Sequence, residues 1–383
     1  MSGALNGIRI VDLTAVISGP VATQILADQG AEVIKIEPPG GDQTRSYLSG
    51  AQKVSTSFVS SNRNKKSVVL DLKLKADLEK LYRLISTADV FIENFRPGAA
   101  ERMGLGEDKL RVLCPNIIYA SINGFGETGP YADKRVYDPI VQATSGSVAL
   151  PADPAEGQPR MVQFVLADKV TALTAAQAVT AAIVARNRTG EGQSVKISMQ
   201  EAMLAFLWPS ALGALTLPDS PTKSPARAGK VFKTTDGWIT ASANTGSEWQ
   251  GLCAALNRPE WLSDQRYMTP GARILNGTLL FQAMQDDFAQ DTSSHWLALL
   301  DAHDVPCAPI LGVDDLPTDP QIVHRGSIEQ FDHPEWGVIR QARPAARFSR
   351  TPSAIRSMAP SLGQHTDEIL ATLASISIAD DKM

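Results

Sequence analysis

Residues 7–41 read GIRIVDLTAVISGPVATQILADQGAEVIKIEPPGG, and this stretch decides the fold class. Residues 8–13 and 31–37 are short β-branched runs, which predicts two strands. Residues 21–29 between them have helical periodicity, and Gly19-Pro20 is a typical helix entry. A strand, a helix and a second strand with short connections predict a βαβ unit with parallel strands.

The same alternation continues along the first half of the chain. The expected strands cover residues 68–72, 90–93, 117–122 and 193–198, and the expected helices cover residues 76–86, 107–113 and 169–185. This pattern predicts an α/β fold in which helices cover both faces of a parallel sheet. In such sheets ligands bind at the carboxyl ends of the strands.

The length of 383 residues favours two domains over one. Residues 208–229 are rich in Pro, Ser, Thr and Lys, a composition typical of a linker. We therefore expect a large domain over residues 1–200, a linker over 201–228 and a smaller α+β domain over 229–330. A return segment over 331–383 is expected to end in a helix that packs on the large domain.

Composition and charge exclude several classes of partner. The formal charge of −5 gives no reason to expect nucleic acid, and no apolar run approaches the roughly 18 residues that span a bilayer. The N-terminus lacks the features of a secretion signal. Cys114, Cys253 and Cys307 are too far apart for a disulfide framework or a metal cluster, so we expect a cytoplasmic setting.

All five histidines follow residue 294. Neither a histidine-metal site nor a Ser-His-Asp triad can therefore be built within the first 294 residues. Residues 62–75 contain five Lys or Arg against the single acid Asp71, which suits either a phosphate-bearing ligand or a solvated face. The turn at Gly19-Pro20 is not a G-x-G-x-x-G fingerprint, so a nicotinamide cofactor is unsupported.

Asp168 is the acid that the pattern singles out. It follows the apolar segment 161–167 and comes just before the long apolar helix. Aspartate is a favoured helix N-cap, and a structural role of that kind is compatible with a chemical one. The positive end of the helix dipole would hold the carboxylate ionised, while apolar neighbours would leave it poorly solvated and therefore nucleophilic.

The sequence resembles the family III coenzyme A-transferases, which include formyl-CoA transferase and carnitine CoA-transferase, and the related α-methylacyl-CoA racemases. The resemblance runs nearly end to end. It is carried by residues 7–14, 19–20, 27–37, 41–42, 45, 64–67, 93–98, 102–104, 124–126 and 360–368.

This resemblance implies a Rossmann-like large domain with a parallel sheet, a small domain, and two subunits interlocked as a homodimer. It implies that Asp168 is the catalytic aspartate. It places Val16, Leu70, Lys73, Asn94, Phe95 and Arg102 on coenzyme A contacts, and Arg135 where a relative has a contacting lysine. Two departures stand out: Pro38 replaces a phosphate-binding arginine, and residues 226–237 lack the glycine run of the lid in formyl-CoA transferase.

Tyr137 decides between transfer and racemisation. The related racemases have a histidine here, because inverting an α-carbon needs two acid/base groups of suitable pKa. A tyrosine with an ordinary pKa near 10 suits that task poorly, and the transferases have tyrosine in this substrate pocket. We therefore expect CoA transfer through mixed anhydrides and an aspartyl-CoA thioester, with racemisation as the alternative. Coenzyme A would be a substrate, with no permanently bound cofactor and no metal.

Overall fold

The computed structural model describes residues 3–47, 54–150, 158–209, 211–219 and 230–373. The chain divides into two compact units. The large unit contains residues 1–212 and 326–383, and the small unit contains residues 213–325. None of the helices described is long and apolar enough to cross a bilayer.

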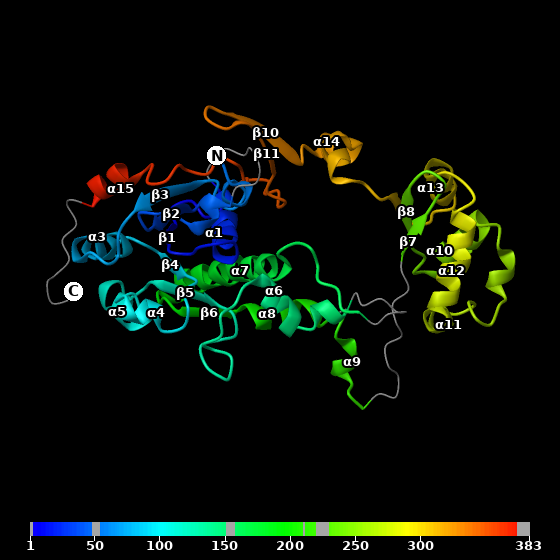
Figure 1. The fold of residues 1–383 in the computed structure, drawn as a ribbon, viewed down its shortest axis with the longest axis horizontal. Coiled ribbons are helices and arrows are strands. Elements are labelled where there is room, and N and C mark those ends of the chain that lie inside the picture. The colour runs from blue at the N-terminus through cyan, green and yellow to red at the C-terminus, as the bar shows by residue number, and fades with distance from the viewer. Residues whose placement is uncertain (1–2, 48–53, 151–157, 210, 220–229, 374–383) are drawn as a thin grey trace. The chain divides into compact units, whose positions relative to one another are not determined.

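The large unit is built on a six-stranded sheet in which every strand pair is parallel (Figure 1). The strand order is β3-β2-β1-β4-β5-β6. The strands are β1 (Arg9–Asp12), β2 (Glu32–Glu37), β3 (Lys65–Val69), β4 (Val90–Glu93), β5 (Ile118–Asn123) and β6 (Ser194–Ser198). This is the Rossmann order, and it reverses direction between β1 and β4, where such folds bind ligands. The predicted α/β class with a parallel sheet is confirmed.

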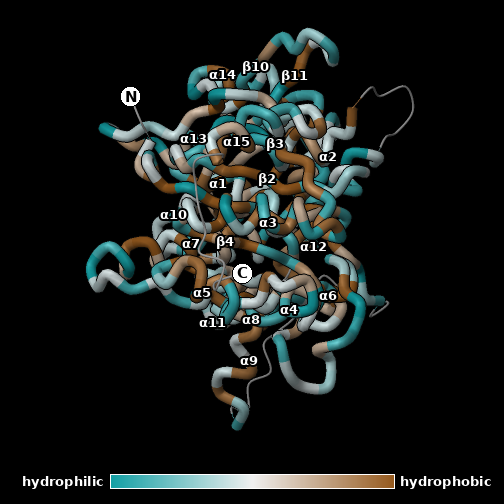
Figure 2. Tube along the Cα trace, turned by 90° about the vertical axis from the view of Figure 1, so that its left-hand side faces the viewer, coloured by the Kyte–Doolittle hydropathy of each residue, from teal (hydrophilic) through white to brown (hydrophobic). Residues whose placement is uncertain are grey.

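Helices cover both faces of this sheet because the strands are apolar on both sides. The principal ones are α1 (Ser18–Asp28), α3 (Lys75–Ile85), α4 (Ala99–Arg102), α5 (Glu107–Leu113), α6 (Asp138–Thr144), α7 (Leu166–Thr189) and α8 (Met199–Leu207). Helices α1, α7 and α8 share one core cluster with the sheet, and α3 and α5 share a second cluster on the other face. In Figure 2 brown segments lie beside the label of β2, a strand whose Val33, Ile34 and Ile36 are buried.

The small unit has its own three-stranded antiparallel sheet, in the order β7-β8-β9. The strands are β7 (Val231–Lys233), β8 (Trp238–Ala241) and β9 (Cys307–Pro309), and the helices include α10 (Gly246–Ala255), α11 (Pro270–Leu275), α12 (Gly277–Phe288), α13 (Ser293–Ala302) and α14 (Pro320–Arg325). Its core is rich in aromatic side chains, among them Phe232, Trp249 and Phe288. This unit is the smaller α+β part of the predicted fold.

The C-terminal segment covers the edge of the large sheet. A hairpin of β10 (Ile328–His333) and β11 (Gly337–Ala342) precedes a long extended stretch and helix α15 (Thr366–Thr372). The N–H of His365 donates to the carbonyl of Ser67 at 3.0 Å, and Val69 N–H donates to Thr366 Oγ1 at 3.0 Å. These bonds satisfy the outer side of edge strand β3, which would otherwise be open to pairing with another chain.

The expected linker over residues 201–228 is wrong at its start. Helix α8 continues to Leu207, and Ala202, Met203 and Leu207 are buried in the core cluster of α7. The Pro- and Ser-rich composition begins only after these buried positions. Residues 220–229, the centre of the expected linker, lie outside the described residues.

Candidate active site

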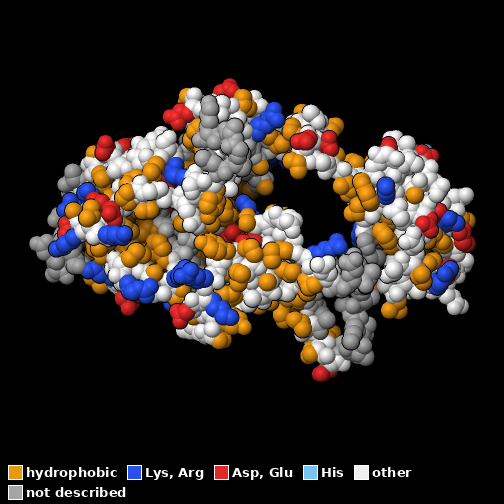
Figure 3. All heavy atoms as spheres, in the orientation of Figure 1, with side chains coloured by type: hydrophobic (Ala, Val, Ile, Leu, Met, Phe, Trp, Pro, Cys, Tyr) orange, Lys and Arg blue, Asp and Glu red, His pale blue; other side chains and the backbone are white. Residues whose placement is uncertain are grey.

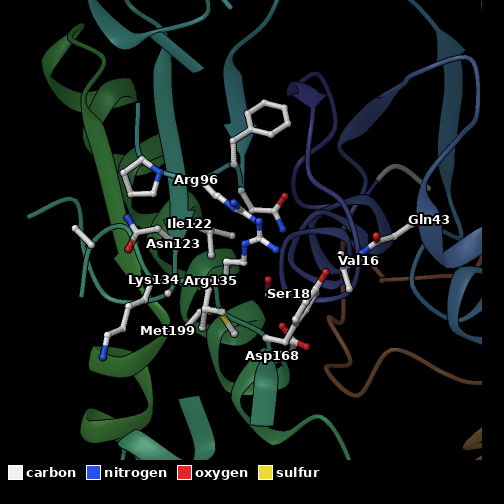
Figure 4. Close-up of a pocket in the computed structure, with 17 residues that line it drawn as sticks. Val16, Ser18, Gln43, Arg96, Ile122, Asn123, Lys134, Arg135, Asp168 and Met199 are labelled. Atoms are coloured by element: carbon white, nitrogen blue, oxygen red, sulfur yellow. The ribbon is translucent and has the colours of Figure 1, made fainter. Parts of the chain in front are cut away.

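A pocket opens at the carboxyl ends of β1, β4 and β5, entirely within the large unit (Figure 4). Its lining includes five residues that the sequence singled out: Val16, Asn94, Phe95, Arg135 and Tyr137. Asp168 lines the same pocket. The structure therefore brings the proposed nucleophile together with most of the expected ligand contacts.

Asp168 lies in the first turn of α7, but it is not the N-cap. Val165 caps the helix, so Asp168 is its third residue, and only 8 % of Asp168 is exposed. Its backbone N–H donates to Oδ1 of Asp138 at 3.0 Å. Ser18, the first residue of α1, lines the same pocket, and its N–H and hydroxyl favour the charged form of this carboxylate. The carboxylate thus lies at the N-termini of two helices, where negative charge is stabilised.

Opposing effects set the charge of this carboxylate. Burial and the negative charge of Asp138 raise the pKa of Asp168 to about 6, although Ser18 and Lys169 act in the opposite direction. Burial raises a carboxyl pKa because it disfavours the charged form, and the helix dipoles only partly offset that cost. At neutral pH Asp168 is therefore mostly ionised but poorly solvated, a state suited to nucleophilic attack.

A second groove lies beside the first, at the carboxyl ends of β2 and β3. Its lining includes Thr14, Leu70, Lys73 and Phe95. Phe95 and Gln43 line both hollows, so the hollow of Lys73 adjoins the hollow of Asp168. Two adjoining hollows can hold a long ligand with a polar end in one hollow and a reactive end in the other.

Basic side chains also lie on the surface of the large unit outside the two hollows. Figure 3 shows Lys and Arg side chains gathered on the face of the large unit over α3, α4 and α5. Arg102, a predicted contact, belongs to α4 but lines neither hollow. Its place within the predicted ligand set has no support from the pocket geometry.

Most of the basic segment 62–75 is occupied by internal pairing. Arg63 contacts Asp28 at 2.7 Å, Lys65 contacts Asp12 at 3.1 Å, and Lys66 contacts Glu368 at 2.9 Å. These three cations tie the sheet and its flanking segments together. Of the five Lys and Arg residues in segment 62–75, Lys73 alone lines the groove at the ends of β2 and β3. Arg63 and Lys65 are buried, so neither a solvated face nor a ligand contact describes them.

Sequence analysis missed four residues of the site: Ser18, Arg96, Lys134 and Asp138. Asp138 is 30 positions away from Asp168, and nothing in the local pattern predicts that their side chain and backbone meet. Arg96 follows two predicted contacts directly in sequence, and that adjacency was the available signal. In the described part of the chain the side chains of Arg96 and Arg135 have no hydrogen-bond or ion-pair partner, and both point into the pocket (Figure 4).

Comparison with known proteins identifies the chain's family. Residues 5–366 match the family described as CoA-transferase family III. The chain belongs to this family. It is 36% identical to the succinyl-CoA:glutarate CoA-transferase of Mus musculus over 96% of this chain and 85% of that protein. It is 33% identical to a formyl-CoA:oxalate CoA-transferase of Rhodopseudomonas palustris, over 98% and 95% of the two chains.

Solved structures agree with this family assignment. The crystal structure of Rv3272 from Mycobacterium tuberculosis superposes with a TM-score of 0.85 at 31% identity, covering 96% of this chain and 99% of that one. A CaiB/BaiF family protein from Brucella suis gives a TM-score of 0.83 at 31% identity, covering 97% and 100%. The family III resemblance and the assignment as a CoA-transferase are confirmed. The roles of the individual site residues stay predictions.

Proposed function

We propose that this enzyme moves coenzyme A from an acyl-CoA donor to a carboxylic acid acceptor with Asp168 as the covalent nucleophile. The observation that carries the proposal is the position of Asp168. It is nearly buried, lines a pocket at the topological switch point of the sheet, and shares that pocket with Ser18, which favours its charged form. A carboxylate in such a place attacks an acyl group more readily than one fully solvated in water.

The reaction is an exchange of acyl partners. The Asp168 carboxylate attacks the thioester carbonyl, forming a mixed anhydride and releasing the CoA thiolate. The thiolate then attacks the aspartyl carbonyl of that anhydride, which releases the donor acid and leaves an aspartyl-CoA thioester. The acceptor carboxylate attacks this thioester, and the returning thiolate takes the acceptor acyl group and frees Asp168. Each step breaks one acyl bond as another forms, so no oxidant is needed.

The two adjoining hollows suggest where the parts of the CoA thioester bind. We propose that the nucleotide part of CoA lies in the groove with Leu70 and Lys73, and that the pantetheine arm passes Phe95 and Val16 towards Asp168. Arg102 and Arg135 are proposed coenzyme A contacts, and Tyr137 a substrate-pocket residue. The interlocked homodimer and the cytoplasmic setting belong to the same proposal, with CoA as a substrate and no permanently bound cofactor.

Trapping the covalent intermediate tests this function. After incubation with succinyl-CoA and no acceptor, we expect peptide mass spectrometry to find an adduct of coenzyme A mass on the peptide containing Asp168. The thioester should react with hydroxylamine, and it should be absent from an Asp168→Ala variant. Transfer activity without any adduct on that peptide, or an equal adduct in the variant, would contradict the proposed nucleophile.

We also propose that the acids are short dicarboxylic acids. Two kinds of observation support this: the relatives that act on succinyl-CoA and glutarate, and the cations Arg96, Lys134 and Arg135 in the pocket of Asp168. One carboxylate of the acid must react, so a second would need a cation such as Arg96, whose side chain has no protein partner among the described residues.

An Arg96→Ala variant is expected to raise KM for glutarate about tenfold or more, because a charge-assisted hydrogen bond contributes roughly 1.5–3 kcal/mol. KM for a monocarboxylic acid of similar length should change little, and Arg96→Lys should be intermediate. The measurement is steady-state transfer from one donor to both acceptors. A rise in KM for the CoA thioester alone, equal for both acceptors, would instead assign Arg96 to a phosphate.

A further inference from the structure

The connection between β1 and α1 is held by side chains from three neighbouring strands. Asp12, at the end of β1, accepts the Thr14 N–H at 2.8 Å, and Lys35 of β2 donates to the Thr14 carbonyl at 2.6 Å. Asn94, just after β4, makes two bonds to Ala15. Its Oδ1 accepts from the Ala15 N–H and its Nδ2 donates to the Ala15 carbonyl, both at 2.8 Å. Both backbone groups of Ala15 are therefore fixed by one amide.

The residue after this clamp has an unfavourable backbone conformation. Val16 has φ of 71°, in the left-handed region that β-branched residues rarely adopt. A strained residue persists only where its surroundings determine its conformation. The surroundings here are the bonds to Thr14 and Ala15 on one side and helix α1 on the other.

The strained turn sets the direction in which α1 begins. Its N-cap, Ile17, makes no side-chain capping bond, and the next residue, Ser18, lines the pocket of Asp168 with its N–H and hydroxyl as donors that lower the pKa of that carboxylate. A different conformation at Val16 would rotate these donors away from the carboxylate. The position of Ser18 therefore depends on the backbone at Ala15. Asn94 fixes this backbone two residues before the N-cap Ile17.

We propose that Asn94 is a positioning residue whose amide clamp on Ala15 holds Val16 in its left-handed conformation and thereby aims Ser18 at Asp168. The inference rests on the proposed function of Asp168. The resemblance implies that Asn94 contacts coenzyme A, whereas here both polar atoms of its amide are engaged with protein backbone. Its effect on the reaction therefore passes through Ser18.

Several charges face Asp168 besides these donors. Asp138 approaches from α6, Lys169 is its neighbour on α7, and Arg96, Lys134 and Arg135 line the same pocket. The side-chain bonds to Ala15 come from Asn94 and not from these charged groups. Loss of the clamp should therefore act mainly through the Ser18 donors, and the charged form of Asp168 would lose their support.

The test is the pH dependence of kcat/KM in the full-length protein, with succinyl-CoA and glutarate as the probe pair. The parent enzyme should lose activity below a midpoint near pH 6, because Asp168 must be ionised to attack. In Asn94→Ala we expect this midpoint to rise by about one pH unit, which lowers activity at pH 6 several-fold more than at pH 8.5. Ser18→Ala, which removes only the hydroxyl, should give a smaller rise.

Asn64→Ala is the matched control. The amide of Asn64 also clamps backbone, with Nδ2 donating to the Ala354 carbonyl at 2.8 Å and Oδ1 accepting from the Arg356 N–H at 2.6 Å. Asn64 lines neither hollow of the site. This variant should lower Tm without moving the pH midpoint, which separates general destabilisation from positioning.

Two further variants keep the inference falsifiable if Asn94→Ala folds poorly. Asn94→Asp keeps the acceptor for the Ala15 N–H but loses the donor, so its midpoint should lie between those of the parent and Asn94→Ala. In a Val16→Gly background, where positive φ carries no strain, the shift caused by Asn94→Ala should shrink.

An unchanged midpoint in both Asn94 variants, with KM for the CoA thioester raised equally at every pH, would overturn the positioning role and leave Asn94 a ligand contact. The proposed function fails separately. It is refuted if Asp168→Ala turns over normally, whatever the Asn94 variants do.

Discussion

An Asp168→Asn variant is expected to lose CoA transfer by a factor of at least about 1,000, and at pH 8 to unfold at a higher temperature than the parent. Activity is lost because the amide cannot form an anhydride or a thioester, and removal of a covalent nucleophile typically costs at least that factor. The asparagine carbonyl oxygen can still accept from Ser18, so local geometry should be kept. A thioester exchange assay and thermal unfolding of the same samples measure the two effects.

The gain in stability follows from the raised pKa of Asp168. The folded protein holds a proton on this group up to about pH 6, whereas the unfolded chain releases it near 3.8. The group therefore contributes stability below pH 4 that is lost as pH rises through 6. A difference of about two pKa units corresponds to roughly 3 kcal/mol at pH 8, which amounts to a few degrees in Tm.

The pH dependence makes the prediction specific. Parent and Asp168→Asn should have nearly equal Tm near pH 4 and differ most at pH 8. Asp332→Asn, on an exposed position of β10, should show no such divergence. A lower Tm for Asp168→Asn at pH 8 would mean that the ionised carboxylate stabilises the fold. Burial of the charge would then not reduce the free energy of unfolding.

The fold was predictable from the sequence where apolar periodicity decides the structure. Residues 90–93 and 107–113 were predicted with the bounds that β4 and α5 have. Strand β3 begins three residues before its prediction because it opens with Lys65, a charged residue that is buried and paired with Asp12 of β1. The start of the linker was misplaced for a similar reason, since α8 is anchored by tertiary burial of Ala202 and Met203.

The site was predictable only where one residue carries its own signal. Asp168 stands out because an acid follows an apolar segment at a helix start. Its partners Ser18 and Asp138 have no such signal in the sequence. They belong to α1 and α6, and they lie close to Asp168 only because these helices pack against the same sheet. The helix dipole does favour the ionised form of Asp168, as expected from the sequence. Burial and the negative charge of Asp138 oppose that effect by raising the pKa of Asp168, and neither can be read from the sequence.

The second large effect is expected at Asp12, a fully buried acid at the carboxyl end of β1. Its Oδ2 contacts Lys65 at 3.1 Å and accepts from the Thr23 hydroxyl at 2.6 Å, while Oδ1 accepts from Thr14. Although burial alone would raise it, the charges of Lys65 and Lys35 hold the pKa of Asp12 below its usual value. Burial lowers the pKa of Lys65 to about 8, so at pH 7 both members of the pair are charged.

Asp12→Ala should therefore destabilise the protein by about 3–5 kcal/mol, because it leaves Lys65 buried without its counter-charge. Removing the acid of the exposed pair Lys196–Glu127 should cost less than about 1 kcal/mol, which makes Glu127→Ala the control. Urea unfolding at pH 7 measures both. An Asp12→Ala protein as stable as the control would show that water or another group replaces the lost charge.

Replacing both charges separates the two roles of Asp12. The pair Asp12→Leu with Lys65→Met should recover most of the lost stability, because apolar side chains of similar volume often replace a buried ion pair without loss. Transfer activity should stay low in the same protein, because the Thr14 N–H has lost its acceptor and the path from Thr14 to Ser18 is no longer fixed on that side. If stability and activity returned together, the ion pair would act on the reaction only by keeping the sheet folded.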